Sequence, residues 1–370
     1  MKFYKKAVSL AEQIDPSDPC NEALYKVAYF YQNGIEVEKN LQKAIDFYQE
    51  AAYNKHEKSM NALGSLFYNE LKEYSQAAEW FRNAASHGCP RALNNLGICY
   101  EFGHGIEVDM DQAFQQYKES SDKGYIPAKY NLACIYLLKA RNSNLRDHYK
   151  ESANLFLQVL AKDDSKTEAY FYLGQFFEQG LGVDQDFSTA LRYYRKAASR
   201  DFAKAHTKCG DLLYSGRGRQ ERRNKTEAFK CYQRAAALGD SEAVNNMGLM
   251  IENGFDDRPS DSDSALEIYR QAHKMGNADS VINIALYYIR GKSPVEMDQK
   301  KGKEILKQAY KIGTPSSKDT VLEYMLTFGF IKTKKDMEIE ILNMDEEVVS
   351  WMAQSSTGFN NIPTTSKRTN

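Results

Sequence analysis

Residues 168–201 read as three consecutive segments, EAYFYLGQFFEQG (168–180), LGVDQDF (181–187) and STALRYYRKAASRD (188–201). The two outer segments space their apolar and small residues as amphipathic helices do, and the middle one has the composition of a turn. The residues of these three segments that recur elsewhere in the chain are Ala169, Gly174, Gly180, Ala190, Tyr194 and the pair Ala197-Ala198. We therefore expect a helical hairpin, and the same pattern recurs along the chain.

Three columns of mostly small residues show this recurrence in register over eight units. In the first helix of each unit the small residue recurs at intervals of 36, 33, 36, 41, 36, 38 and 37 residues, at Ala28, Gly64, Gly97, Ala133, Gly174, Gly210, Gly248 and Ala285. The second helix carries Ala44, Ala77, Ala113, Ala153, Ala190, Ala228, Ala265 and Gly302, and a third column follows seven residues after each. Small residues let helices approach closely, so the pattern predicts an all-α, right-handed solenoid of helix-turn-helix repeats.

Glycines recur at the expected end of the first helix, at Gly34, Gly103, Gly180, Gly216, Gly254 and Gly291. A helix commonly ends at a glycine in the left-handed conformation. The G-x-G stretches at these turns lack the third glycine and the preceding strand of a dinucleotide site. We interpret them as turns.

The units resemble Sel-one-like repeats, a solenoid family related to tetratricopeptide repeats. The pattern A-x-x-x-L-G-x-x-Y-x-x-G-x-G-V followed by K-A-x-x-x-Y-x-x-A-A-x-x-G is matched closely at 92–124, 169–198 and 205–239, and the resemblance covers roughly 22–313. The second unit departs from it, with YNELKEYSQAAEW in place of the G-x-G turn. In the fourth, LLKARNSNLRDHYKES predicts a lengthened loop, which could bend the superhelix or contact another molecule, or be a tolerated insertion.

The repeats divide the chain into four predicted parts. Residues 1–19 form an N-terminal capping helix, 20–313 the eight repeats, 314–354 C-terminal capping helices and 355–370 a disordered polar tail. The last amphipathic stretch, KKDMEIEILNMDEEVVSWMAQ, is expected to cover the apolar face of the final unit. Docking onto another chain is the alternative.

The composition indicates which classes of partner and which cellular compartment to expect. With 49 basic and 50 acidic residues, the formal charge of -1 gives no global argument for nucleic acid. No apolar run is long enough for a membrane span, so direct membrane insertion is not expected. The six cysteines form no C-x-x-C pair, which favours free thiols and a cytoplasmic protein, alone or within a larger cytoskeletal or organelle-associated complex.

No motif points to catalysis. The six histidines are scattered without a metal-binding spacing, and no nucleophile elbow, phosphate-binding loop or kinase signature is present. The sequence predicts no catalytic residue, cofactor or metal site.

By analogy with tetratricopeptide repeats, the first helices would line a concave groove. Positions three before and four after the small residue would face it, and asparagines and aromatics there suit protein partners that present extended peptide segments or helices. The candidate groove residues are Asn61, Tyr68, Asn94, Glu101, Tyr130, Phe171, Glu178, Asn245 and Glu252. The alternative is that some of them contact adjacent helices instead.

A basic turn in the sixth unit, GRGRQERRNK, is a second candidate site. Its side chains could bind an acidic partner or a phosphate group. They are Arg217, Arg219, Arg222, Arg223 and Lys225. The turn of the next unit, GFDDRPSDSD, is acidic, so mutual neutralisation is the alternative.

The sequence thus favours a non-catalytic adaptor or scaffold that holds protein segments in its groove and helps to assemble or position a multiprotein complex. The alternative is a permanent structural subunit of a large assembly, for example a cytoskeletal or ciliary one.

Overall fold

The computed structural model describes residues 21–143, 145–217 and 224–342. The described residues are helical apart from turns and a single isolated bridge between Phe255 and Arg258. The chain divides into two compact units, Met1–Gln185 and Asp186–Asn370. The predicted N-terminal capping helix, most of the last amphipathic stretch and the polar tail lie outside the described residues.

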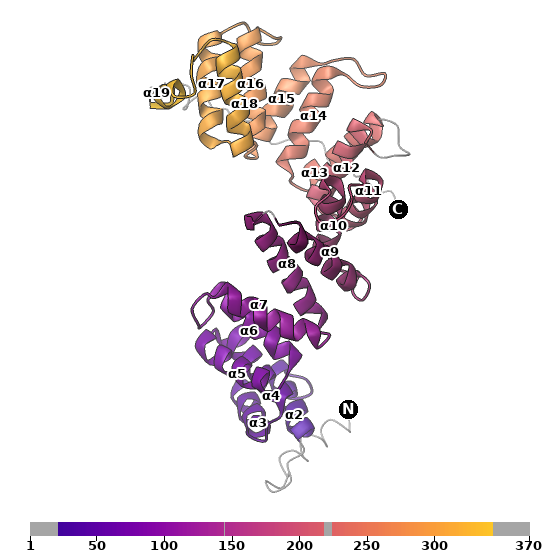
Figure 1. The fold of residues 1–370 in the computed structure, drawn as a ribbon, viewed down its shortest axis with the longest axis vertical. Coiled ribbons are helices and arrows are strands. Elements are labelled where there is room, and N and C mark those ends of the chain that lie inside the picture. Colours follow the sequence, from indigo (N-terminus) through magenta and orange to yellow (C-terminus); the bar gives the residue numbers. More distant parts are fainter. Residues whose placement is uncertain (1–20, 144, 218–223, 343–370) are drawn as a thin grey trace. The chain divides into compact units, whose positions relative to one another are not determined.

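In the first unit, helix pairs follow one another along the chain (Figure 1). The helices are α2 (Asn21–Asn33), α3 (Leu41–Tyr53), α4 (Glu57–Leu66), the π-helical turn η1 (Phe67–Leu71), α5 (Tyr74–Ser86), α6 (Pro90–Phe102), α7 (Met110–Asp122), α8 (Ile126–Ser143), α9 (Arg146–Leu160) and α10 (Thr167–Gln179). Each even-numbered helix up to α8 packs on the helix that follows it, and each pair packs on the next pair. This is the predicted helix-turn-helix solenoid.

The second unit continues the same pattern. Its helices are α11 (Phe187–Ala198), α12 (Ala203–Ser215), α13 (Lys225–Ala237), α14 (Ser241–Asn253), α15 (Ser262–Lys274), α16 (Ala278–Arg290), α17 (Gln299–Ile312), α18 (Pro315–Thr327) and α19 (Asp336–Leu342). An apolar cluster spans α15 to α19 and includes Met337, which is 1% exposed. The start of the last amphipathic stretch therefore packs against the core of this unit.

The small residues of the first helices are contact points for a ring of the second helix. A Cβ atom added at Gly97 would lie 2.7 Å from the Tyr117 ring, and one at Gly248 would lie 2.6 Å from the Tyr269 ring. Gly64 meets Phe81 in the same way. These rings are almost completely buried, so each of these three helix pairs is held together by an aromatic ring lying on a residue without a side chain.

An asparagine or aspartate begins most of the second helices, four residues before their small residue. Asp109, for example, accepts hydrogen bonds from the backbone N–H groups of Asp111 and Gln112 at 3.0 and 2.9 Å. Such caps satisfy N–H groups that the helix leaves unpaired, and each contributes about 1 kcal/mol. The equivalent caps are Asn40, Asp186, Asn224, Asp261 and Asp298.

The glycine turns hold adjacent repeats together as well as ending helices. Gly103 and Gly180 end α6 and α10 in the left-handed conformation, with φ of 70° at both. The second glycine of the turn has another role, because a Cβ atom at Gly105 would lie 2.3 Å from the backbone of Tyr74 in the preceding repeat. Only glycine permits this approach, so the G-x-G stretch is a stacking turn.

The second and fourth repeats, which depart from the repeat pattern, connect their two helices in different ways. In the second unit of the repeat array, the shortened turn is built by η1 and by Lys72 in the left-handed conformation. In the fourth, the prediction of a lengthened loop was wrong. Helix α8 continues to Ser143 and α9 begins at Arg146; the insertion lengthens the helix because residues 137–143 (LLKARNS) contain no glycine or proline to end it.

Candidate functional site

The predicted groove asparagines lie beneath the surface of the first helices. Asn61, Asn94 and Asn245 are only 5–6% exposed. Each side-chain oxygen accepts a hydrogen bond from an asparagine of the next repeat, at 2.9–3.0 Å. We call these bonds the asparagine ladder; its pairs are Asn95 to Asn61, Asn131 to Asn94 and Asn283 to Asn245. A buried amide left unpaired costs about 1–3 kcal/mol, so the ladder links successive repeats.

Tyr130 and Phe171, in the same column, also make contacts within the first unit. The Tyr130 ring lies edge-on to Phe156 at 5.8 Å between centroids, and the Lys166 ammonium lies 5.6 Å from its centre. Burial raises the pKa of the Tyr130 hydroxyl. Phe171 is buried and its ring lies 6.0 Å from that of Tyr172. This column therefore presents little surface to a partner.

The acids of the second predicted column bond to buried tyrosines. Glu101 accepts a hydrogen bond from the Tyr117 hydroxyl at 2.7 Å, and Glu252 accepts one from Tyr269 at 2.5 Å. Lys292 donates to the other oxygen of Glu252 at 2.7 Å. Burial, followed by the bonded carboxylate, raises the pKa of both tyrosines. These acids hold the second helix of their own repeat against the first.

Tyr68 and Glu178, in this same column, are half-buried. The hydroxyl of Tyr68 lies 2.6 Å from Nδ1 of His104, a residue in the next glycine turn. The backbone carbonyl of Glu178 accepts a hydrogen bond from the Gln185 amide at 2.8 Å. Tyr68 is therefore held in place while part of its ring stays accessible.

A neighbouring set of positions forms the accessible surface of the first helices. Positions two before, one after and five after the small residue share one helical face, because they are three and four residues apart. None of the fifteen residues at these positions in the first unit is buried. We call this set the exposed face; it comprises Lys26, Tyr29, Asn33, Ala62, Ser65, Asn69, Asn95, Ile98, Phe102, Asn131, Cys134, Leu138, Tyr172, Gln175 and Gln179.

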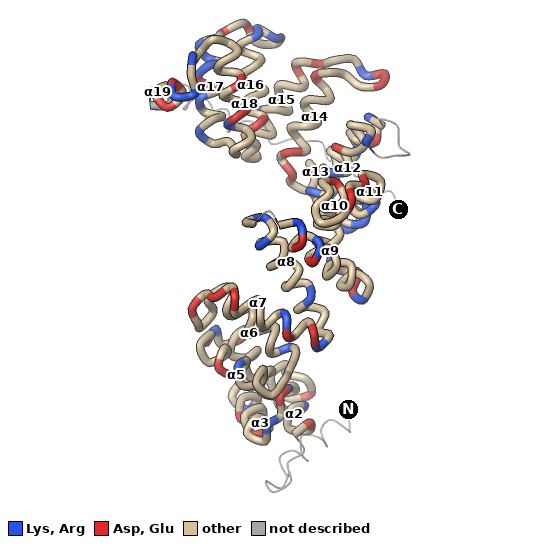
Figure 2. Tube along the Cα trace, viewed as in Figure 1, with Lys and Arg blue, Asp and Glu red and all other residues tan. Residues whose placement is uncertain are grey.

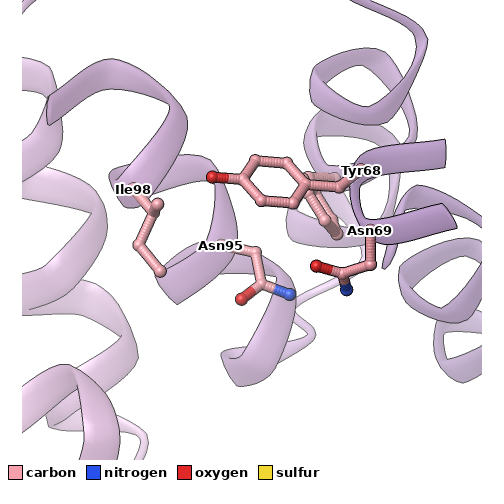
Figure 3. Close-up of a pocket in the computed structure, with 5 residues that line it drawn as sticks. Tyr68, Asn69, Asn95 and Ile98 are labelled. Atoms are coloured by element: carbon pink, nitrogen blue, oxygen red, sulfur yellow. The ribbon is translucent and has the colours of Figure 1, made fainter. Parts of the chain in front are cut away.

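A pocket of about 190 Å³ opens on this face between the second and third repeats. It is lined by Tyr68, Asn69, Phe81, Asn95 and Ile98. Figure 3 shows the Tyr68 ring beside the pocket and the amides of Asn69 and Asn95 turned toward one another. Phe81 is 2% exposed and closes the bottom. The pocket combines an apolar interior with two amides at its rim.

A pocket of about 230 Å³ occupies the equivalent place in the second unit. Four kinds of residue recur: a tyrosine four after the small residue, a ring of the second helix, and from the next repeat an asparagine two before its small residue and an aliphatic residue one after it. In this unit they are Tyr214, Tyr232, Asn246 and Leu249, together with Asp211 and Met250. The Asp211 carboxylate accepts hydrogen bonds from Tyr232 and Asn246 at 2.9 and 3.2 Å.

The basic turn is only partly described. Arg219, Arg222 and Arg223 lie outside the described residues. The Arg217 guanidinium lies 5.6 Å from the centre of the Phe187 ring, and Lys225 begins α13. In the following acidic turn, Asp256 accepts a hydrogen bond from Thr226, at the start of the same α13. Binding of an acidic partner by this turn stays a prediction.

Burial also shifts the pKa of several thiols and imidazoles. Burial raises the pKa of the thiols of Cys99 and Cys134 to about 11. It lowers the pKa of the imidazoles of His206 and His273. Over residues 21–143, 145–217 and 224–342, no three potential metal ligands come together, and no helix is both long and apolar enough to cross a membrane.

The repeats match a known family model. The model of the Sel1 repeat matches residues 21–56, 58–89, 90–125, 167–202, 203–240 and 241–277, more than half of the chain. The chain belongs to the Sel1 repeat family. The pairs α8–α9 and α16–α17 lie outside these matches, yet they pack as the other pairs do.

Two solved Sel1-type structures share the fold. The chain superposes with a TM-score of 0.68 and 20% identity on c5321, a protective antigen of uropathogenic Escherichia coli with an SLR fold, covering 95% of this chain and 78% of that one. It superposes with a TM-score of 0.57 and 20% identity on a Sel1 repeat protein of Oxalobacter formigenes, covering 87% and 90%.

Three curated proteins are similar to part of this Sel1 repeat protein. An uncharacterized protein of Neisseria meningitidis is 25% identical over 268 residues, 57% of each chain. The mouse DAP3-binding cell death enhancer 1 is 34% identical over 179 residues, 48% of this chain and 34% of its own length. The chitin synthase regulator SKT5 of Saccharomyces cerevisiae is 24% identical over 242 residues, 61% of this chain and 34% of its own. The chain thus spans about half or less of these relatives.

Proposed function

We propose that this Sel1 repeat protein is a non-catalytic adaptor or scaffold. It holds a segment of another protein against its first helices and so helps to assemble or position a multiprotein complex. The observation that carries the proposal is the recurrence of one pocket, built from the same four kinds of residue, in both units. A repeated pocket suits a partner that contacts several repeats.

The size of the pockets supports a protein segment over a free small molecule. Pockets for small-molecule ligands usually measure about 300–1,000 Å³. Those of about 190 and 230 Å³ are smaller and suit single side chains. The names of two relatives, a DAP3-binding protein and a regulator of chitin synthase, support an interaction role for proteins that contain such repeats.

The proposed binding residues lie mainly beside the predicted columns, at positions two before, one after and five after the small residue. Asn61, Asn94 and Asn245 support the surface through the asparagine ladder, while the residues beside them meet the partner. Tyr68 keeps its predicted role because it lines the first pocket. The signal in the sequence was the column of Asn95, Asn131, Asn246 and Asn283, directly after the candidate column.

Comparative affinity purification tests the proposal. Ile98→Asp and Leu249→Asp place a charge in each pocket, and Leu157→Asp is the control because Leu157 is 40% exposed on a second helix, α9. We expect a partner identified by mass spectrometry with the unmodified protein to be retained by the control and reduced about tenfold or more by the pocket variants. A partner retained by all three variants would contradict binding at the pockets.

A permanent structural subunit is the second candidate. Such a subunit would also use surfaces outside the first helices, where single apolar side chains are exposed: Tyr53 is 79% exposed, Val108 62% and Met297 64%. Obligate co-purification with fixed partners, unaffected by changes in the pockets, would support this role. The cytoplasm stays the predicted compartment under either function.

A further inference from the structure

The exposed face of the first unit is almost uncharged. Charged residues make up 27% of the chain, so fifteen average positions would contain about four. The exposed face contains one, Lys26 at its N-terminal end. Elsewhere, acidic and basic residues are scattered over both units (Figure 2). The equivalent nine positions of the second unit include Lys208, Asp211 and Arg290, so this neutrality belongs to the first unit.

The charges that border the face offset one another. One helical turn before it stand two acids and two bases, Glu22, Lys58, Arg91 and Glu168. Lys58 lies 3.2 Å from Glu22. Glu101 and Glu178 lie beside the face and are half-buried, and the Glu101 carboxylate is bonded to Tyr117. The face therefore offers no cluster of one sign to a charged partner.

Neutrality selects among partners through desolvation. A charged side chain brought onto this face would lose contact with water without gaining an opposite charge, which is costly. An uncharged segment pays only a small desolvation free energy on the same face. Such a surface rejects charged competitors by leaving their charges unpaired.

The polar groups of the face match a peptide backbone. Six of its residues carry amides, which both donate and accept hydrogen bonds: Asn33, Asn69, Asn95, Asn131, Gln175 and Gln179. The ladder bonds of Asn95 and Asn131 fix the orientation of their side chains. An extended segment has free N–H and C=O groups to meet these amides, whereas a helix has already paired its own.

The pocket adds a requirement for one apolar side chain. Tyr68, Phe81 and Ile98 surround a volume of about 190 Å³. Phe102 in the third repeat and Leu138 in the fourth add exposed apolar side chains to the same face. A large aliphatic or aromatic side chain is the group that fits this chemistry.

We propose that the first unit binds an extended, uncharged protein segment that places a large aliphatic or aromatic side chain between Tyr68 and Ile98. This partner class deepens the proposed function and rests on it. The segment is recognised by its neutral side chains and its backbone, and acidic or basic tails are excluded.

Selection of displayed random peptides on the full-length protein tests this inference. We expect Asp, Glu, Lys and Arg to fall several-fold below their frequency in the unselected library, and a large apolar residue to recur. The affinity of an enriched peptide, measured by fluorescence anisotropy, should change by less than about twofold with salt, since there are no close opposite charges to screen. Ile98→Lys should weaken it about tenfold or more.

The control variant Leu157→Lys should leave the affinity unchanged, and circular dichroism checks that both variants are folded. Enriched peptides that are charged, yet weakened by Ile98→Lys, would overturn the neutral partner class and leave the adaptor role standing. Peptides unaffected by Ile98→Lys would overturn binding at the pocket itself. A selection without enriched peptides would overturn the extended segment as the form of the partner.

Discussion

At the scale of single residues, the repeats depend on places where a side chain is missing. Gly97 lets the ring of Tyr117 lie against the backbone of α6, and Tyr117 is fixed there because it is completely buried and bonded to Glu101. The ring cannot move aside without breaking that bond. The glycine is therefore a packing residue, although it lies inside a helix.

Gly97→Ala should destabilise the protein despite improving helix propensity. The propensity gain is about 1 kcal/mol, and overpacking costs about 1–3 kcal/mol. We expect a net loss of up to about 2 kcal/mol, measured by urea unfolding. Adding Tyr117→Leu should reverse the sign of the Gly97→Ala effect, because the ring that the methyl group meets is gone. An equal loss in both backgrounds would contradict the contact.

His273 should make stability fall on acidification. Burial lowers its pKa in the folded protein, whereas the unfolded chain has the ordinary value of about 6.5. Below that value the unfolded state binds more protons, so the free energy of unfolding decreases as the pH falls from about 6.5 toward the folded-state pKa. Melting temperatures of His273→Leu should vary less between about pH 7.5 and about pH 5.5 than those of the unmodified protein. Burial also lowers the pKa of His56 and His206, so part of the dependence of melting temperature on pH should remain in His273→Leu. A pH dependence equal to that of the unmodified protein would contradict the role of His273.

At the scale of elements, the stacking turn sets how closely repeats approach. Gly105 and Gly124 both have positive φ, 77° and 84°, but a Cβ atom at Gly105 meets the backbone of Tyr74 while one at Gly124 meets nothing within 4 Å. An alanine at either position would therefore have the same backbone strain, but only an alanine at Gly105 would clash with the preceding repeat.

Gly105→Ala should cost more stability than Gly124→Ala. The left-handed conformation costs each alanine about 1–2 kcal/mol. The clash at Gly105 requires the turn to move away from the preceding repeat, so the melting temperature of Gly105→Ala should fall further than that of Gly124→Ala. Equal melting temperatures for the two variants would show that the close approach does not matter for stability.

The sequence was sufficient to predict the elements and their order. Small residues, turn glycines and buried tyrosines recur because each makes the same kind of contact in most repeats. The site was harder to predict, because two adjacent asparagines such as Asn94 and Asn95 look alike in sequence. Which one is buried depends on the rotation of the helix against the next repeat. The end of α8 depended in the same way on packing, which no single turn residue signals.

At the scale of the whole molecule, stability should be local. One apolar cluster lies in α2 to α6 and another in α15 to α19. Repeats contact mainly their neighbours, so a change in one repeat should affect adjacent ones most.

Hydrogen exchange in Gly97→Ala tests this locality. We expect faster exchange in α5 to α8 and unchanged exchange in α16 and α17, because local opening spreads through neighbouring contacts. Mass spectrometry of peptic fragments resolves the two regions. Equal acceleration throughout the chain would indicate a single cooperative unit.

The asparagine ladder has a consequence for how such a chain can grow. The repeat at 90–125 carries Asn95, which donates to the preceding repeat, and Asn94, which accepts from the following one. A tandem duplication of this segment in the gene would bring both partners with it, so every bond across the new junction could form again. Arrays of this kind can gain or lose a repeat in a single genetic event without leaving a buried amide unpaired.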